Sequence, residues 1–148
     1  MIAVSIVPQS QRLAMMDMEA AVSRGAGLVE LRLDRLRQVP ELRSLLASKK
    51  CPVIVSCRRP QDGGHWQGDE AARLKLLRQA AEAGADYVEI ELDCAPQAPR
   101  SGKAKRIISF TTLSEPVQDL DKVRTETLKH AADVIRIAVP TPALEQAW

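Results

Sequence analysis

The sequence is short of aromatic residues, histidines and long apolar runs. Only 3% of its 148 residues are aromatic, so a stacking platform for single-stranded nucleic acid is not expected. Its uncharged stretches fall far short of the roughly 18 apolar residues that a membrane span requires. The first residues also lack a basic region ahead of their short apolar run. We therefore expect no nucleic-acid partner, no membrane partner and a cytoplasmic location.

Cysteine is also scarce. Cys51, Cys57 and Cys94 are odd in number and lack the spacing of zinc ligands. They are predicted to be small buried hydrophobic residues in a reducing compartment. We expect neither a metal site nor a cofactor.

The remaining composition is that of an ordinary globular protein, with 45% hydrophobic residues, 27% charged residues and a net charge of +2. A length of 148 residues predicts one domain, over residues 1–148, with a moderate core.

Two periodicities alternate along the chain. Runs typical of strands occur at 2–7, 28–34, 52–58, 87–93, 106–111 and 134–139. Helical spacing of apolar residues occurs at 10–24, 39–49, 68–83 and 115–131. Residues 94–105 contain two prolines and predict a loop or a single turn. Strands that alternate with helices indicate parallel strands joined by right-handed crossovers.

An internal repeat supports this alternation. GAGLVELRLD at 25–34 and GADYVEIELD at 84–93 match at six positions, and Gly25 and Gly84 stand where helices would end. The repeat predicts βα units, although chance similarity between two strands that follow helix ends stays open.

Each predicted strand has one apolar and one polar face. Val29, Leu31 and Leu33, for example, alternate with charged residues in the second strand. The polar faces hold Glu30, Arg32, Arg58, Glu89, Glu91 and Arg136. Central strands of an open doubly wound sheet would be apolar on both faces. The pattern instead predicts an incomplete (β/α) barrel of the TIM type, with about six units of eight and a polar interior.

The interior charges are expected to pair, because an unpaired ion inside a protein costs several kcal/mol. A purely structural lattice of ion pairs is one interpretation. A ligand site is the other, because barrels keep their sites at the carboxyl ends of the strands.

The order and spacing of five motifs resemble the type I 3-dehydroquinate dehydratases. The motifs are VELRLD at 29–34, IVSCRRPQDGG at 54–64, YVEIELD at 87–93, KRIISF at 105–110 and IRIAVP at 135–140. The resemblance implies an eight-unit barrel of the shikimate pathway. In that family a strand lysine forms an imine with the substrate ketone and a histidine moves protons while water is lost.

The resemblance also implies site residues. Glu30, Arg32 and Arg58 match residues that line the substrate pocket, and Asp62 matches an acid that helps to orient the histidine. A small-molecule substrate with a carboxylate on a polyhydroxylated ring is expected as the partner, since arginine forks and fixed acids suit such groups.

The two catalytic positions differ from the family. Arg136 stands where the lysine is expected and Thr111 where the histidine is expected. A guanidinium stays protonated and cannot attack a carbonyl, and threonine does not titrate near neutrality. No confident catalytic residue can therefore be named.

Replacements for these two residues are hard to find. Seven lysines occur, and all fall in predicted helices, in loops or ahead of a strand: Lys49, Lys50, Lys75, Lys103, Lys105, Lys122 and Lys129. His65, in a loop beside Trp66, is a candidate general base, although packing against Trp66 is the simpler interpretation.

The given sequence stops after six predicted strands, where Thr141 and Pro142 look like the start of a helix. Two units that carry a further arginine and a lid in the family are expected to be missing. The outer strands would then have free edges. We expect either a homo-oligomer or a piece of a longer chain.

Three functional hypotheses follow. The first is a 3-dehydroquinate dehydratase that is inactive as this chain. The second is a non-catalytic binding or regulatory protein with an anion-binding pocket. The third is a flavodoxin-like sheet that binds phosphate, which the sequence disfavours because no glycine-rich phosphate motif follows a strand.

Overall fold

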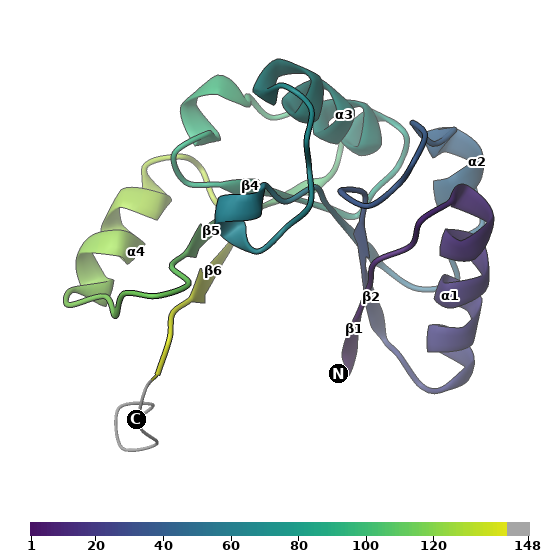
Figure 1. The fold of residues 1–148 in the computed structure, drawn as a ribbon, viewed down its shortest axis with the longest axis horizontal. Helices are drawn as coiled ribbons and strands as arrows, with labels where there is room; N and C mark the ends of the chain where they lie inside the picture. The colour runs from purple at the N-terminus through teal and green to yellow at the C-terminus, as the bar shows by residue number, and fades with distance from the viewer. Residues whose placement is uncertain (142–148) are drawn as a thin grey trace.

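The structure, a computed structural model, describes residues 1–141. Six parallel strands form one sheet in the order in which they occur along the chain. The sheet curls into an incomplete barrel whose helices lie on the outer side (Figure 1). The strands are β1 (Ala3–Ile6), β2 (Leu28–Arg32), β3 (Val53–Ser56), β4 (Tyr87–Glu91), β5 (Lys105–Thr111) and β6 (Val134–Ala138). This confirms the predicted fold class.

The sequential strand order excludes the flavodoxin-like hypothesis, because doubly wound sheets reverse their strand order at a switch point. Within residues 1–141, β1 and β6 each pair with a strand on one side only. The covering of these edges by a second chain therefore stays a prediction. The helix expected from Pro142 lies outside the described residues.

Polar side chains fix where the helices begin. The helices are α1 (Gln11–Ser23), α2 (Leu42–Ala47), α3 (Glu70–Glu82) and α4 (Leu120–Leu128). Ser10, Asp69 and Asp119 each accept a hydrogen bond from a backbone N–H in the first turn of α1, α3 and α4. The predictions for α2 and α4 were too long, since Pro40 and Pro116 precede their capping residues.

Glycines with a left-handed backbone conformation follow the ends of α1 and α3. Gly25 and Gly84 have φ angles of 93° and 106°, which side chains with a Cβ rarely adopt. Each glycine is followed within a few residues by a strand, β2 or β4. The two copies of the sequence repeat therefore have the same local structure.

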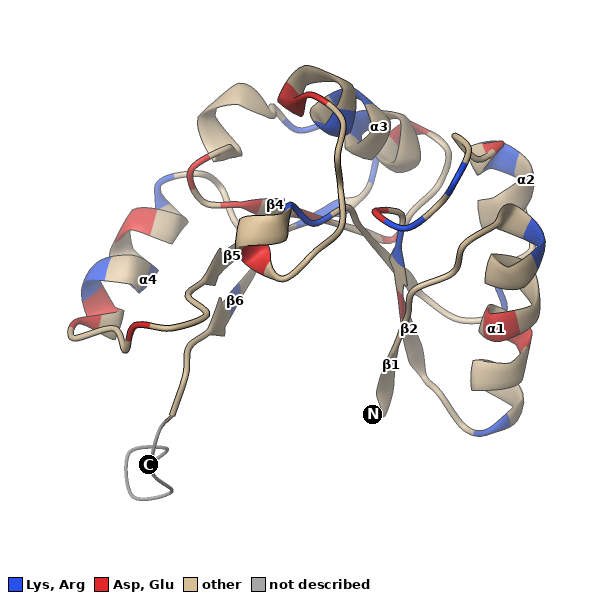
Figure 2. Ribbon diagram, in the orientation of Figure 1, with Lys and Arg blue, Asp and Glu red and all other residues tan. Residues whose placement is uncertain are grey.

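The outer face of the sheet forms the core with the helices. Val29, Leu31, Val55 and Ile108 are all fully buried, and they meet the buried stripe of α3 and its neighbours. Charged residues occur on β2, β4 and β6 (Figure 2), and Glu30, Glu89 and Arg136 of these strands meet on the inner face. The predicted division into an apolar outer face and a polar inner face is confirmed for these strands.

One connection carries no α-helix. Between β4 and β5 the chain makes only the 3-10 turn η2 (Ala95–Gln97), as the two prolines predicted. A second 3-10 turn, η1 (Pro60–Asp62), follows β3. Among residues 1–141 no helix is both long enough and apolar enough to cross a membrane.

Candidate functional site

Four charged side chains meet inside the curl of the sheet. Arg136 Nη1, on β6, lies 2.8 Å from Glu89 Oε2 and 3.3 Å from Glu30 Oε1. Arg58 Nη2 lies 3.0 Å from Glu30 Oε1 and 3.1 Å from Glu89 Oε1. Ser56 Oγ donates a further hydrogen bond, of 2.9 Å, to Glu30. We call Glu30, Arg58, Glu89 and Arg136 the inner cluster.

The inner cluster favours the charged form of Glu30. Burial alone would raise the pKa of Glu30, but Arg58 and Arg136 outweigh it and keep that pKa below its ordinary value. Burial would likewise lower the pKa of Arg136, yet Glu89 and Glu30 raise it. Arg136 is therefore a permanent cation between two carboxylates, as predicted from the alternation of β6.

A second acid, Asp34, organises the loop after β3. Its fully buried carboxylate takes two hydrogen bonds from Arg32, of 2.8 and 3.1 Å. It also accepts the backbone N–H groups of Arg58 and His65 at 3.4 and 3.0 Å. Burial would raise the pKa of Asp34, but the hydrogen bonds from Arg32 bring it below its ordinary value.

The lowered pKa values of Glu30 and Asp34 predict a loss of stability in acid. A carboxylate with a lower pKa in the folded state stabilises the fold above its unfolded pKa, and this stabilisation is lost as the pH falls through the folded value. We expect the free energy of unfolding in urea to fall from pH 6 to pH 3. Glu30→Gln should flatten this dependence. An unchanged pH dependence in Glu30→Gln would contradict the assignment.

His65 lies beside Asp34 rather than in the inner cluster. Its Nδ1 is 3.4 Å from Asp34 Oδ2, and its side chain is 47% exposed. Arg32 bridges the same region, because its Nη2 also donates to the carbonyl of Gly63 at 3.1 Å. His65 and Arg32 therefore share one carboxylate, and the partly buried neighbour Trp66 packs against the core.

The paired glycines let this loop fold back on itself. Gly63 has a φ angle of 76°, and a Cβ on Gly64 would lie 2.0 Å from the carbonyl oxygen of Arg58. The close approach allows the backbone N–H of Trp66 to donate to that same carbonyl at 3.1 Å. The loop thus returns to the end of β3 and carries His65 to Asp34.

Asp62 is buried and paired within its own loop. Arg59 Nε lies 2.6 Å from Asp62 Oδ2, and Arg59 Nη1 reaches Asp93 at 2.9 Å. Asp62 and Thr111 line one cavity of about 350 Å³ at the carboxyl ends of β4 and β5, together with Ser109. Asp62 and Thr111, the residues that the resemblance assigned to the family's acid and histidine, therefore line the same cavity.

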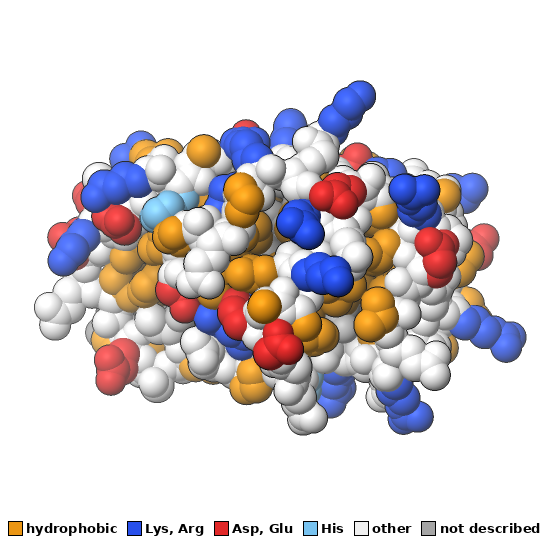
Figure 3. Space-filling model, turned by 90° about the horizontal axis from the view of Figure 1, so that it is seen from above, with side chains coloured by type: hydrophobic (Ala, Val, Ile, Leu, Met, Phe, Trp, Pro, Cys, Tyr) orange, Lys and Arg blue, Asp and Glu red, His pale blue; other side chains and the backbone are white. Residues whose placement is uncertain are grey.

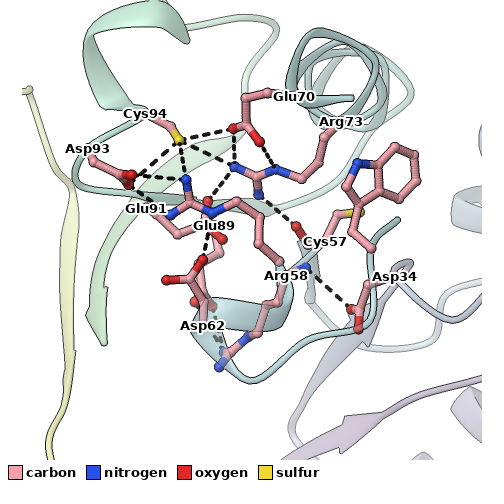
Figure 4. Close-up of polar contacts among 12 residues, drawn as sticks. Asp34, Cys57, Arg58, Asp62, Glu70, Arg73, Glu89, Glu91, Asp93 and Cys94 are labelled. Atoms are coloured by element: carbon pink, nitrogen blue, oxygen red, sulfur yellow. Dashed lines mark hydrogen bonds and ion pairs between the residues drawn. The ribbon is translucent and has the colours of Figure 1, made fainter. Parts of the chain in front are cut away.

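A polar network next to this cavity joins α3 to β4 (Figure 4). The Arg73 side chain is fully buried, and its Nη2 lies 2.6 Å from Glu70 Oε1 and 2.7 Å from Glu91 Oε2. Arg73 Nη1 donates to the carbonyl of Cys57 at 2.6 Å. Glu91 was predicted to line the interior with Glu89, but its carboxylate turns to Arg73 on the helix.

Cys94 belongs to the same network. Its Sγ is 3.0 Å from Glu70 Oε1 and 3.2 Å from Arg59 Nη1. Burial raises the pKa of Cys94 to about 12, and the hydrogen bond to Glu70 adds to this effect. The prediction of three buried apolar cysteines was therefore incomplete: Cys57 is buried, Cys51 is half-buried, and Cys94 is buried among charges.

The lysines lie away from the inner cluster. Lys49 pairs with Asp86 at 2.6 Å, and Lys105 lies over the ring of Tyr87 at the amino end of its strand. Lys105 is the first residue of β5, so the prediction that it precedes the strand was wrong by one residue. Within residues 1–141 no group of His, Cys, Asp and Glu is arranged to hold a metal ion.

The site predicted from sequence is thus assembled only in part. Glu30, Arg58 and Arg136 come together, while Arg32 pairs with Asp34 and Asp62 pairs with Arg59. Sequence reasoning missed Asp34, Arg59 and Arg73. Arg73 had a detectable signal, because it falls three and four residues before Leu76 and Leu77 on the buried stripe of α3.

Comparisons with known proteins agree on one family. The family model of type I 3-dehydroquinase matches residues 2–148. A 3-dehydroquinate dehydratase from Methanothermobacter thermautotrophicus is 36% identical over 125 residues, which cover 80% of this chain and 56% of that protein. A bifunctional 3-dehydroquinate dehydratase/shikimate dehydrogenase from Arabidopsis thaliana is 34% identical over 125 residues, covering 77% of this chain and 21% of that protein.

A solved structure shares the fold. The crystal structure of 3-dehydroquinate dehydratase from Geobacillus kaustophilus superposes with a TM-score of 0.85 at 18% identity, covering 97% of this chain and 63% of that one. The chain spans less than two thirds of the length of each of these proteins. Because the family model matches nearly every residue, the chain belongs to the type I 3-dehydroquinase family.

Proposed function

We propose that this chain binds a small polyhydroxylated carboxylate at the carboxyl ends of its strands and does not dehydrate it through an imine. The observation that carries the proposal is Arg136, which is held by Glu89 at 2.8 Å and by Glu30 at 3.3 Å. Only a primary amine can form an imine with a ketone. A guanidinium stays protonated at any pH at which proteins work.

The proton-transfer position supports the same proposal. Loss of water through an imine needs a base with a pKa near the working pH, and histidine supplies one. The resemblance assigns Thr111 to that position, and Thr111 lies on β5 and lines the same cavity as Asp62. His65 lies in the loop after β3, where its backbone N–H donates to Asp34 and its Nδ1 lies 3.4 Å from the same carboxylate. An imine mechanism would therefore lack both its nucleophile and its base.

The ligand contacts are proposed residue by residue. Arg32 and Arg58 would receive the carboxylate, while Glu30 and Asp62 would accept hydrogen bonds from ligand hydroxyl groups. Arg58 Nε supports this role, because it is buried without an acceptor among the described residues. The inner cluster contains two arginines and two glutamates and is electrically balanced. Because an incoming carboxylate must share arginines that are already paired, we expect affinity of roughly millimolar strength.

Borohydride trapping tests the loss of imine chemistry. The protein is incubated with 3-dehydroquinate and sodium borohydride, and its intact mass is measured. We expect no added mass in the natural sequence. Arg136→Lys is the matched control, because it places a primary amine at the same position. An adduct on the natural sequence would show that another lysine reacts and would overturn the proposal.

Calorimetry tests the binding half of the proposal separately. Titration with 3-dehydroquinate, or with shikimate, should give weak binding that Arg58→Met removes. Arg12→Met, on the exposed side of α1, is the control and should bind as the natural sequence does. If neither 3-dehydroquinate nor shikimate binds at millimolar concentration, the proposal that the chain retains a binding pocket is refuted.

A further inference from the structure

The gap in the helical cover leaves a cavity on the outside of the sheet. Between β4 and β5 the chain makes only the short turn η2, so this connection places no α-helix on the outer face next to α3. A cavity of about 550 Å³ opens there, between α3, β4 and residues 97–106. Leu74, Leu77, Val88 and Ile90 contribute its apolar wall. We call it the outer cavity.

The outer cavity has a buried arginine in its wall. Arg106, on β5, is only 8% exposed. Its Nη2 donates to the carbonyl of Ala95 at 2.6 Å, and its Nε is enclosed without an acceptor. None of the ion pairs among residues 1–141 includes Arg106. This guanidinium therefore lacks an anionic partner in an ion pair. A buried cation without a carboxylate costs several kcal/mol.

Two carboxylates around the outer cavity already have other cationic partners. Asp133 accepts the backbone N–H of Arg106 at 2.7 Å and pairs with Arg100 Nη1 at 2.9 Å. Glu70 is the one acid of residues 1–141 that lines the outer cavity, and it is paired with Arg73 at 2.6 Å. Asp133 still raises the pKa of Arg106 through its charge, but neither acid forms an ion pair with the Arg106 guanidinium.

The rim adds further positive charge. Lys75, Arg78 and Arg100 line the cavity and are exposed. Burial lowers the pKa of Arg106, and the neighbouring Arg100 lowers it further. Seen from the side of α3, apolar side chains reach the surface in patches that lie among basic and acidic side chains (Figure 3).

We propose that the outer cavity binds a small organic acid whose carboxylate meets Arg106 and whose apolar body covers Leu77 and Ile90. Carboxylates match the guanidinium geometry, and sites for small ligands are usually apolar cavities of about 300 to 1,000 Å³ with a few polar groups. The outer cavity lies on the face of the sheet opposite the inner cluster. The proposal is therefore independent of the function proposed above.

Calorimetric titration with 2-naphthoate tests this proposal, with 2-naphthamide as the neutral analogue of equal size. We expect the carboxylate to bind at or below about 1 mM and the amide about tenfold more weakly or worse. Arg106→Met should weaken binding of 2-naphthoate about tenfold or more. Arg12→Met, which removes an arginine from α1, should leave it unchanged.

A second variant keeps the test decisive if Arg106→Met does not fold. Ala71 lies on the exposed side of α3 and lines the outer cavity, so Ala71→Trp should fill the space without disturbing the core. We expect it to abolish binding of 2-naphthoate. Equal binding of the acid and the amide, unaltered binding in Ala71→Trp, or no binding of 2-naphthoate at several millimolar would each overturn the proposal.

Discussion

Replacing Arg73 by methionine is expected to lower the free energy of unfolding by about 3 to 5 kcal/mol, the range for breaking a buried ion pair from one side. The Arg73 side chain is fully buried and is the partner of Glu91, whose side chain is 7% exposed. Its loss would leave the Glu91 carboxylate in the interior without a cation. Urea denaturation at pH 7 measures the effect.

The pH dependence of this loss is also specified. Burial raises the pKa of Glu91 even with Arg73 present, and removal of Arg73 would raise it further. A group with a raised folded pKa is most favourable below its unfolded pKa, and it loses stability as the pH rises through the folded value. The defect of Arg73→Met should therefore be larger at pH 8 than at pH 5.

Two comparisons isolate the cause. Arg78→Met makes the same change on the same helix, but Arg78 is 57% exposed and lies 3.9 Å from Glu82, so a loss below about 1 kcal/mol is expected. Adding Glu91→Gln to Arg73→Met should recover part of the stability. If Arg73→Met and Arg78→Met cost the same, the buried pair does not hold α3 to β4.

Replacing Asp34 by alanine is the second large effect that we expect, again of about 3 to 5 kcal/mol. The change would leave Arg32, 14% exposed, without its carboxylate. It would also remove the acceptor of two backbone N–H groups, those of Arg58 and His65. Urea denaturation gives the overall loss, and hydrogen exchange should show faster exchange of the His65 amide.

Asp93→Ala is the matched control for Asp34→Ala. The Asp93 side chain is 61% exposed although it pairs with Arg59, so its removal should cost below about 1 kcal/mol. Asp34→Asn should fall between the two, because an amide oxygen can still accept hydrogen bonds but carries no charge. Slow exchange of the His65 amide in Asp34→Ala would argue against Asp34 as the anchor of this loop.

Much of the fold could be read from periodicity. Side chains of a strand alternate between two faces. The polar residues of β2 and β6 therefore predicted a charged interior in which Arg136 pairs with acids. Glu30 and Glu89 are its partners in the structure. The sequence repeat predicted equivalent local structures, which the left-handed Gly25 and Gly84 confirm.

The pairing at the ends of the strands could not be predicted in this way. There the alternation stops, and backbone turns decide which way a side chain points. Glu91 turns to a helix, and Asp62 is taken by Arg59, three residues before it. The outer cavity was also hidden, because it depends on how residues 97–104 lie over the sheet. Arg106 sits in a strand whose apolar pattern gave no sign of a missing anion.

The inner cluster has a consequence for the order of folding. The contact between Arg136 and Glu30 joins residues 106 positions apart in the sequence, whereas Arg58 and Glu30 are 28 apart. Closing a longer loop costs more chain entropy, and contacts of large sequence separation slow folding. During synthesis, Glu30, Arg58 and Glu89 are made before Arg136. Until β6 is made, the two glutamates of the inner cluster share the single cation Arg58. The last described strand therefore completes the neutralisation of a site that the first four strands have already outlined.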